Sequence, residues 1–310
     1  MKIDVIIPTY RPGKKFLELM KRLSAQSVKA DRIIIMNTEE KYFDGFLYGT
    51  EFARTYPEAE IHHLSKREFD HGGTRDIAAV RSDADLFLCM TQDAVPADGH
   101  LIERLRDAVC QAEDIAVAYA RQLAEMGCSE IERYGRSFNY PEQSCVKGKE
   151  QLETLGIKTY FCSNVCAIYK RDIFCAIGGF EKHTIFNEDM IYAAKAVKAG
   201  YRIAYAADAC VYHSHNYTPK EQFHRNFDNG VSQAQHPEIF SQISSESEGV
   251  RMVKKTIGHL CRVKKPWLIP RLIVDCGARY TGFFLGKHYR SLPAGMVLRC
   301  SSNRDYWKRK

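Results

Sequence analysis

The sequence predicts an α/β fold, a doubly wound and mostly parallel sheet followed by a basic helical tail. Short apolar runs, largely β-branched, alternate with segments whose apolar positions recur at helical spacing. Such alternation is typical of parallel sheets with right-handed helical crossovers. With 310 residues the chain is long enough to bury a complete core, and its residues 250–310 differ from the rest in charge.

The predicted elements follow one another in a regular order. Strands are expected at 3–7, 32–36, 61–64, 86–90, 115–120, 164–169, 202–205 and 209–212. Helices are expected at 13–26, after Gly72-Gly73-Thr74, from 98–99 to about 110, at 171–177 and at 188–199. Residues 121–160 show weak periodicity and are interpreted as an excursion with acceptor-side loops, and 241–249 as a linker. We therefore predict a catalytic domain at 1–240 and a basic helical region at 250–310.

The sequence shows no sign of a membrane span or a secretory signal. The start, Met1–Pro8, is too short and too charged for a signal peptide, and no run of about 18 uncharged apolar residues occurs. The eleven cysteines are scattered without a CxxC pair, which predicts reduced and mostly buried thiols rather than a zinc site. We expect a cytoplasmic protein, or one bound at the inner face of the cell membrane.

The tail carries the basic charge of the chain. Residues 250–310 hold 15 Lys and Arg against two acids, a net charge of +13, whereas 1–249 carry −6. Residues 267–288 place apolar side chains near helical spacing, interrupted by Arg271, Asp275 and Arg279. This stripe either packs on the catalytic domain or lies among lipid headgroups. Because the flanking charge favours an anionic surface and no base-stacking platform is evident, we predict peripheral membrane association and no nucleic acid partner.

Two groups of residues could bind a metal ion, because ligands of doubly wound sheets bind at the carboxyl ends of the strands. Asp93 directly follows the apolar run 86–90, where a carboxylate suits Mg²⁺ or Mn²⁺ bridging a diphosphate. The alternative is a helix or turn cap. His213 and His215 are expected on one face at the end of a strand, where one imidazole could complete the site. Lone pairs of this kind are more often surface or hydrogen-bonded histidines.

Two further segments could carry chemistry. Glu188 and Asp189 open a predicted helix, and we expect only one of them to face the site because neighbours on a helix point about 100° apart. Stabilising the helix dipole is the commoner reason for acids there. The segment 72–76, Gly-Gly-Thr-Arg-Asp, offers close backbone approach, a helix N-terminus and a guanidinium, which suits a phosphate or ribose.

Taken in this order, the segments resemble the family 2 glycosyltransferases, whose fold is the GT-A type. The opening strand and the loop after it resemble the family's first strand and nucleotide-contact loop. Residues 73–76 are similar to the family's GxxxARN segment, with Asp76 in place of the usual Asn. Residues 91–93 stand where the family has its DxD motif. The stretch 178–180 with 187–189 is similar to the family's GGF and ED motifs, and 211–215 to a later metal-ligating histidine. Segments 37–40, 71–75, 91–94 and 225–230 resemble the rhamnosyltransferase branch.

The resemblance implies roles for individual residues. It makes Asp189 the catalytic base, and Asp93 with His213 or His215 the ligands of Mn²⁺ or Mg²⁺. The implied donor contacts are Pro8, Thr9, Tyr10, Asn37, Glu39, Gly73, Arg75, Asp76, Gln92, Asp93 and Asn164. Two departures stand out: Thr91 replaces the first Asp of DxD, and no base-reading Asp follows the second strand, where Asn37 or Glu39 stands instead.

The implied function is an inverting, metal-dependent transfer of a sugar, L-rhamnose from dTDP-L-rhamnose, onto a glycan or lipid-linked saccharide in cell-surface polysaccharide synthesis. A UDP-sugar donor within the same family is one alternative. A nucleotidyltransferase is another, but no Gly- and Lys-rich loop follows the first strand. An inactive sugar-nucleotide-binding protein is the non-enzyme alternative. An oligomer is possible under each of these interpretations.

Overall fold

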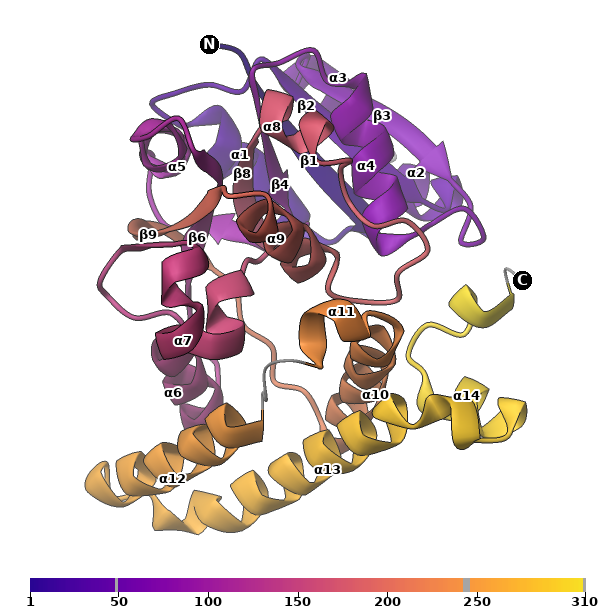
Figure 1. Cartoon of the computed structure of the whole chain (residues 1–310). Coiled ribbons are helices and arrows are strands. Elements are labelled where there is room, and N and C mark those ends of the chain that lie inside the picture. Colours follow the sequence, from indigo (N-terminus) through magenta and orange to yellow (C-terminus); the bar gives the residue numbers. More distant parts are fainter. Residues whose placement is uncertain (48–49, 242–245, 309–310) are drawn as a thin grey trace. The chain divides into compact units, whose positions relative to one another are not determined.

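The computed structural model describes residues 1–47, 50–241 and 246–308, which form two compact units (Figure 1). Unit 1 comprises residues 1–123, 141–183 and 188–213. Unit 2 comprises residues 124–140, 184–187 and 214–310. Unit 1 contains the sheet, whereas unit 2 is helical in the part described.

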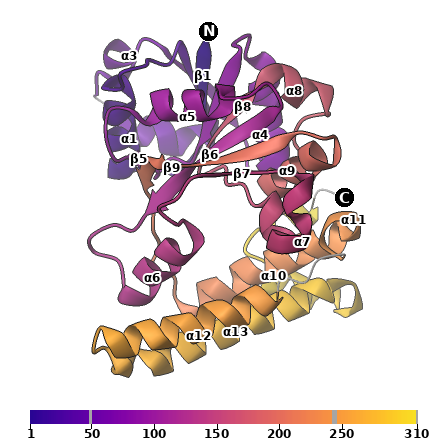
Figure 2. The ribbon, with the colours of Figure 1, turned by 60° about the vertical axis from the view of Figure 1, so that its left-hand side comes forward.

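A mixed nine-stranded sheet is the centre of unit 1 (Figure 2). Its strands are β1 (Ile3–Tyr10), β2 (Arg32–Thr38), β3 (Ala59–Leu64), β4 (Leu86–Met90), β5 (Val95–Pro96), β6 (Ile115–Leu123), β7 (Cys145–Lys147), β8 (Cys166–Lys170) and β9 (Arg202–Tyr212). Their order is β3-β2-β1-β4-β8-β6-β9-β5, and β7 pairs with β9. The predicted α/β class is therefore confirmed.

The strand directions add two details that the sequence did not reveal. β3, β2, β1 and β4 are parallel to one another, as are β6 and β9, but β8 runs antiparallel between β4 and β6. The strands expected separately at 202–205 and 209–212 are one strand, β9. The register between β6 and β9 shifts between Ala120 and Arg121, and such an irregularity bends a strand without ending it.

Helices surround this sheet. They are α1 (Lys14–Ser24), α2 (Glu40–Leu47), α3 (Phe52–Thr55), α4 (His71–Arg81), α5 (Leu101–Cys110), α7 (Leu152–Leu155), α8 (Arg171–Ala176) and α9 (Glu188–Lys198), with short turns at η1 (Lys149–Gln151) and η2 (Gly156–Tyr160). The apolar stripe of α1 is buried in the core, as its spacing predicts. A second cluster packs five aromatic rings together, some stacked and some edge to face: Phe87, Tyr169, Phe174, Phe180 and Tyr192. This aromatic cluster lies directly beside Asn164, whose Oδ1 accepts the Tyr169 hydroxyl at 2.6 Å.

Unit 2 is built from α6 (Glu130–Asn139), α10 (Pro219–Gln235), α11 (Pro237–Phe240), α12 (Glu246–Arg262), α13 (Ile269–Lys287) and α14 (Ala294–Cys300), with turns η3 (Pro266–Leu268), η4 (Tyr289–Ser291) and η5 (Tyr306–Lys308). Helices α10 and α13 lie side by side (Figures 1 and 2). A Cβ at Gly282 would lie 2.3 Å from the carbonyl oxygen of Phe223, and one at Gly286 would lie 2.1 Å from that of Phe227. Glycine is therefore required for the two backbones to approach this closely.

Three further expectations can be compared with the structure. The predicted linker is partly wrong, because residues 246–249 begin α12, and residues 242–245 lie outside the described residues. All eleven cysteines are free, but only Cys89, Cys162, Cys166 and Cys300 are buried, so the expectation of mostly buried thiols is wrong. None of the helices in the described residues has the length and apolar character needed to cross a membrane.

Candidate active site

The carboxyl ends of β1, β2 and β4 hold three polar side chains together. Thr9 donates its hydroxyl proton to Oδ1 of Asn37 at 3.1 Å. The Gln92 amide accepts the N–H of Tyr10 at 3.1 Å and donates to its carbonyl at 2.9 Å, so it links the loops after β1 and β4. Asn37 is fully buried, and its amide nitrogen contacts His63. Its side chain thus orders this edge of the sheet.

Aromatic and cationic side chains surround the end of β1. The Tyr10 and Tyr42 rings meet edge to face at 5.7 Å, and the Arg11 guanidinium lies 4.6 Å from the Tyr42 ring centre and donates to its hydroxyl. Arg11 and Glu39 both have a positive φ, 48° and 66°. Backbone strain of this kind collects at functional sites. Glu39 is held in turn by the N–H of Lys66, which donates to its carboxylate at 2.9 Å.

The glycine motifs at 72–76 and 178–180 interlock although they lie far apart in the sequence. A Cβ on Gly72 would meet the carbonyl oxygen of Glu181 at 1.8 Å, and one on Gly179 would meet Oδ1 of Asp76 at 2.2 Å. That same Asp76 oxygen accepts the N–H of Phe180 at 3.1 Å. Gly73 donates its N–H to the capping carboxylate of Asp70. These contacts give both motifs a role in packing α4 against the segment before α9.

A buried network connects α4 to the start of α9. Arg75 and Glu188 form an ion pair at 3.1 Å, and both side chains are over nine-tenths buried. Glu188 Oε1 accepts the amide of Asn164 at 3.2 Å, and Asp189 Oδ2 accepts the backbone N–H of Asn164 at 2.9 Å. The N–H of Met190 donates to the other Asp189 oxygen at 2.8 Å. Both acids therefore contact Asn164, but Glu188 is buried in its ion pair with Arg75, whereas Asp189 is partly exposed.

The surroundings of Asp189 and Glu188 shift the pKa values of the two carboxyl groups in opposite directions. Burial, together with the neighbouring charge of Glu188, raises the pKa of Asp189 to about 7, although the backbone N–H groups of Asn164 and Met190 act to lower it. Burial also acts to raise the pKa of Glu188, but the Arg75 guanidinium and the Asn164 amide outweigh it and lower that pKa. Two carboxyls whose pKa values are separated in this way are typical of an acid–base site. Asp189 is thus the carboxylate able to exchange a proton near neutral pH.

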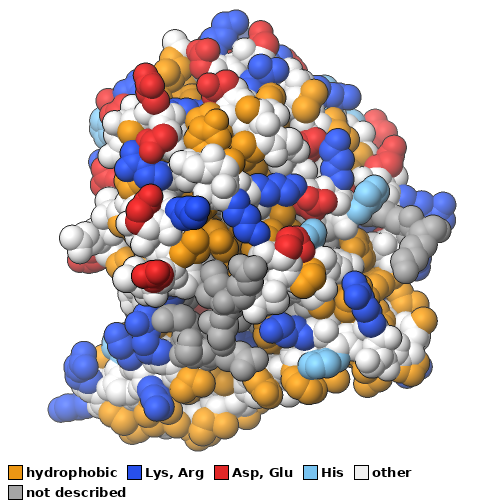
Figure 3. Space-filling model, viewed as in Figure 1, with side chains coloured by type: hydrophobic (Ala, Val, Ile, Leu, Met, Phe, Trp, Pro, Cys, Tyr) orange, Lys and Arg blue, Asp and Glu red, His pale blue; other side chains and the backbone are white. Residues whose placement is uncertain are grey.

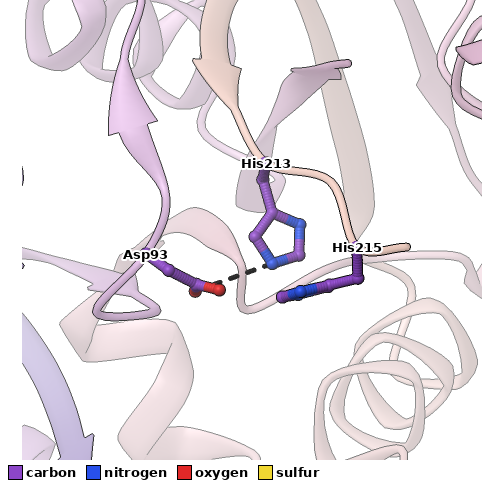
Figure 4. Close-up of side chains that lie close together, drawn as sticks. All are labelled: Asp93, His213 and His215. Atoms are coloured by element: carbon purple, nitrogen blue, oxygen red, sulfur yellow. Dashed lines mark ion pairs between the residues drawn. The ribbon is translucent and has the colours of Figure 1, made fainter. Parts of the chain in front are cut away.

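Asp93 and His213 face each other within unit 1 (Figure 4). The Gln122 amide nitrogen donates to Ser163 at 3.0 Å, so its oxygen, 2.9 Å from His213 Nδ1, accepts the proton that this nitrogen carries. Nε2 lies 3.6 Å from Oδ1 of Asp93, so the two form an ion pair when the ring is protonated, and Nε2 presents a lone pair to the carboxylate when the ring is neutral. Two electron-pair donors that face each other fit a cation placed between them. The Gln122 contact is the outer partner that metal-bound histidines usually have.

His215 follows two residues further along the chain and belongs to unit 2, where its ring packs on Tyr217 at 4.9 Å. Strand β9 ends at Tyr212, at the predicted boundary, so both histidines directly follow the strand. The same strand-end rule that singled out Asp93 also applies to Gln122, near the end of β6, which the sequence analysis missed. The partner of Arg75 was missed too, because 113 positions separate it from Glu188.

Comparison with known proteins agrees with this geometry. Residues 4–178 match the model of Glycosyl transferase family 2. The chain is 39% identical, over 99% of its length and 96% of the relative, to O-antigen chain rhamnosyltransferase RfbN of Salmonella typhimurium. It is 36% identical, over 98% of its length and 95% of the relative, to O-antigen chain rhamnosyltransferase WbaN of Salmonella anatum.

Solved structures with low sequence identity share the fold. S. aureus TarS 1-349 in complex with UDP-GlcNAc gives a TM-score of 0.53 at 16% identity, covering 94% of this chain and 92% of that one. Mannosyltransferase PcManGT from Pyrobaculum calidifontis, in complex with GDP-Man and Mn²⁺, gives 0.57 at 12% identity, covering 100% and 88%. The family match spans more than half of the chain, and the relatives cover nearly all of it. The chain therefore belongs to glycosyl transferase family 2, as its motifs predicted, and it is a glycosyltransferase of the GT-A fold.

Proposed function

We propose that this chain is an inverting, metal-dependent rhamnosyltransferase. It transfers L-rhamnose from dTDP-L-rhamnose onto a glycan or lipid-linked saccharide during the synthesis of a cell-surface polysaccharide. The choice of sugar is supported by two relatives, 39% and 36% identical over nearly the whole chain, that are named O-antigen chain rhamnosyltransferases. The observation that carries the mechanism is the oriented Asp189 carboxylate with its raised pKa.

The nucleotide would bind along the carboxyl ends of β1, β2 and β4, where ligands of such sheets bind. The Tyr10 and Tyr42 rings suit contact with the base of the nucleotide. Arg11 and Lys66 lie beside these rings and suit contact with the phosphates of the nucleotide. Glu39 is partly exposed there, whereas Asn37 is buried and already hydrogen-bonded. We therefore assign recognition of the base to Glu39 rather than to Asn37.

Asp93 and His213 would hold Mn²⁺ or Mg²⁺ beside the diphosphate. The facing carboxylate oxygen and imidazole lone pair support this assignment. Two residues of extended chain reach at most about 7 Å, so His215 stays within reach of the same position as a third ligand. A divalent cation there neutralises the charge that develops on the departing nucleoside diphosphate.

Asp189 would act as the general base. Its carboxylate takes the proton from the acceptor hydroxyl while that oxygen attacks C1 of the sugar, and the bond from C1 to the diphosphate oxygen breaks on the opposite face. One displacement inverts the anomeric configuration and needs no covalent nucleophile. The backbone N–H groups of Asn164 and Met190 fix the carboxylate in one orientation. Its pKa of about 7 lets it accept a proton near neutral pH and release it afterwards.

The tail would bring the enzyme to a lipid-linked acceptor. On α13 one face is buried through Leu272, Gly282 and Gly286. Four apolar side chains on the other face are exposed: Ile273, Val274, Tyr280 and Phe284. Trp267, just before this helix, is 68% exposed. Figure 3 shows hydrophobic side chains along the lower edge of the view, where Figure 1 places α12 and α13, with Lys and Arg beside them. An exposed apolar face flanked by cations suits an anionic lipid surface.

Donor hydrolysis tests this proposal directly. The protein is incubated with Mn²⁺ and dTDP-L-rhamnose, UDP-glucose or UDP-N-acetylglucosamine, and release of the nucleoside diphosphate is measured. We expect dTDP-L-rhamnose to be consumed fastest. Preference for a uridine donor would contradict the choice of sugar and leave the family assignment standing. No release from any donor, combined with thermal stabilisation by one of them, would support an inactive binding protein.

A further inference from the structure

We propose that a pocket lying wholly within unit 2 binds one sugar residue of the acceptor glycan. This inference rests on the proposed function, because it assigns the acceptor side of the same reaction. The pocket has a volume of about 170 Å³ and is bordered by α6, the segment before α10, α10 itself and α13. Its polar lining includes Glu132, Gln222, Arg271, Asp275 and Arg279.

Two buried polar atoms in this lining have no hydrogen-bond partner among the described residues. They are Oδ1 of Asp275 and Nε of Arg279. The Asp275 side chain is 11% exposed, and its other oxygen accepts Nε of Arg271 at 3.0 Å. A buried polar group without a partner costs free energy, and a native structure keeps one where a ligand or water supplies the missing bond. Two of the side chains that line the pocket thus carry an acceptor atom and a donor atom whose hydrogen bonds the described residues do not supply.

The charge of the lining indicates a neutral occupant. Arg271 and Arg279 contribute two positive charges, and Glu132 and Asp275 contribute two negative charges, so the pocket is balanced. A phosphate would face two carboxylates here and gain little. A sugar hydroxyl both donates and accepts hydrogen bonds, so it can satisfy the carboxylate and the guanidinium together.

The size and the apolar wall agree with a single sugar ring. The volume is several times that of one water, about 30 Å³ in the liquid, and below the roughly 300–1,000 Å³ of pockets for drug-sized ligands. Ile131, Tyr217 and Leu268 line it beside the polar groups and suit the C–H faces of a pyranose. His215 also lines the pocket and stands two residues from His213 in the chain, so this pocket and the proposed metal ligands are linked by a short segment.

Binding of simple glycosides tests the pocket. The probes are the methyl glycosides of L-rhamnose, D-galactose and D-mannose at millimolar concentration, followed by saturation-transfer NMR. The full-length protein is first saturated with dTDP and Mn²⁺, which keeps the probes out of the donor site. Arg279→Gln removes the unpartnered donor, and Leu268→Trp fills the cavity without removing a polar group. Arg299→Gln, on the exposed face of α14, is the matched control.

We expect at least one glycoside to bind, with about 10- to 100-fold weaker binding in Arg279→Gln and Leu268→Trp, and unchanged binding in Arg299→Gln. Equal binding by all variants, or no binding by any glycoside, would overturn the proposal, and so would variant-dependent binding of inorganic phosphate. Stabilisation of each variant by dTDP and Mn²⁺ shows that it is folded. If dTDP and Mn²⁺ fail to stabilise the wild type, the proposed function is contradicted. The glycoside binding would still show whether the pocket binds a sugar.

Discussion

The two units of this molecule place their polar side chains by different means. In unit 1 the polar groups follow buried strands, and backbone groups hold them: Gln92 is fixed by both backbone polar groups of Tyr10, and Asp189 by two N–H groups. In unit 2 they stand inside helices, and their positions depend on how closely α10 and α13 pack. A site at the edge of a sheet can therefore be predicted from the sequence, whereas a pocket between helices cannot.

This difference has a physical origin. Parallel strands end at one edge, so residues that follow them in sequence become neighbours in space. A helix points its residues around a full circle, and only the partner helix decides which face is buried. In α13 the glycines at 282 and 286 allow one face of the helix to pack closely on α10, and another apolar face is exposed.

Removing the proposed base should have the largest effect. In Asp189→Asn we expect kcat to fall about 10²- to 10⁴-fold, the usual contribution of general base catalysis, while donor affinity changes little. Transfer of radiolabelled sugar measures this. Asp172→Asn, an exposed acid in the first turn of α8, is the matched control and should retain native turnover. Native turnover in Asp189→Asn would return that residue to a helix-capping role.

Removing the proposed metal ligand should abolish a binding step. In Asp93→Ala we expect Mn²⁺ to lose its effect on donor affinity, because the Thr91 hydroxyl is a poor substitute ligand. His213→Ala should lose more than His215→Ala, since Gln122 orients the His213 ring toward Asp93. Isothermal titration with and without Mn²⁺ measures this, and Asp107→Ala on α5 serves as the control. Full activity in EDTA would remove the metal from the mechanism.

The packing of unit 2 can be tested with two glycines of one helix. A Cβ at Gly286 would lie 2.1 Å from a backbone oxygen, whereas at Gly277 nothing lies within 4 Å. We expect Gly286→Ala to lower the free energy of unfolding by about 1–3 kcal/mol and Gly277→Ala to raise it by up to about 1 kcal/mol. Thermal unfolding midpoints measure both. Equal midpoints would show that α10 and α13 are not held by this close approach.

The sequence predicted much of unit 1 and little of unit 2. The strand at 86–90 was placed to the residue, and the rule for strand ends singled out Asp93 directly after it. The antiparallel direction of β8 could not be predicted, because apolar periodicity is the same in both directions. In the tail, packing and surface exposure were treated as alternatives, whereas the structure of α13 has an apolar face of each kind.

The raised pKa of Asp189 predicts how activity depends on pH. The base must be deprotonated to act, and burial holds its pKa at about 7. We therefore expect kcat to fall about tenfold per pH unit below 7 and to level off above it. Initial rates in overlapping buffers at constant ionic strength measure this. A flat profile between about pH 5.5 and 8 would mean that the proton is taken by another group.

The smallest predicted effect is the loss of membrane binding when one positive charge is removed from the tail. Lys254 is exposed on α12, and one basic residue near an anionic leaflet contributes about 1 kcal/mol, so Lys254→Gln should weaken vesicle binding roughly fivefold. Lys14→Gln removes the same charge from α1 of unit 1 and should leave binding unchanged. Sedimentation with phosphatidylserine vesicles at low salt measures both, and added salt should weaken binding of the wild type. If Lys14→Gln weakens binding as much as Lys254→Gln, the attraction belongs to the net charge of the chain. If the wild type ignores the vesicles, the exposed face of α13 has another partner. Only a loss confined to the α12 variant assigns the membrane surface to unit 2.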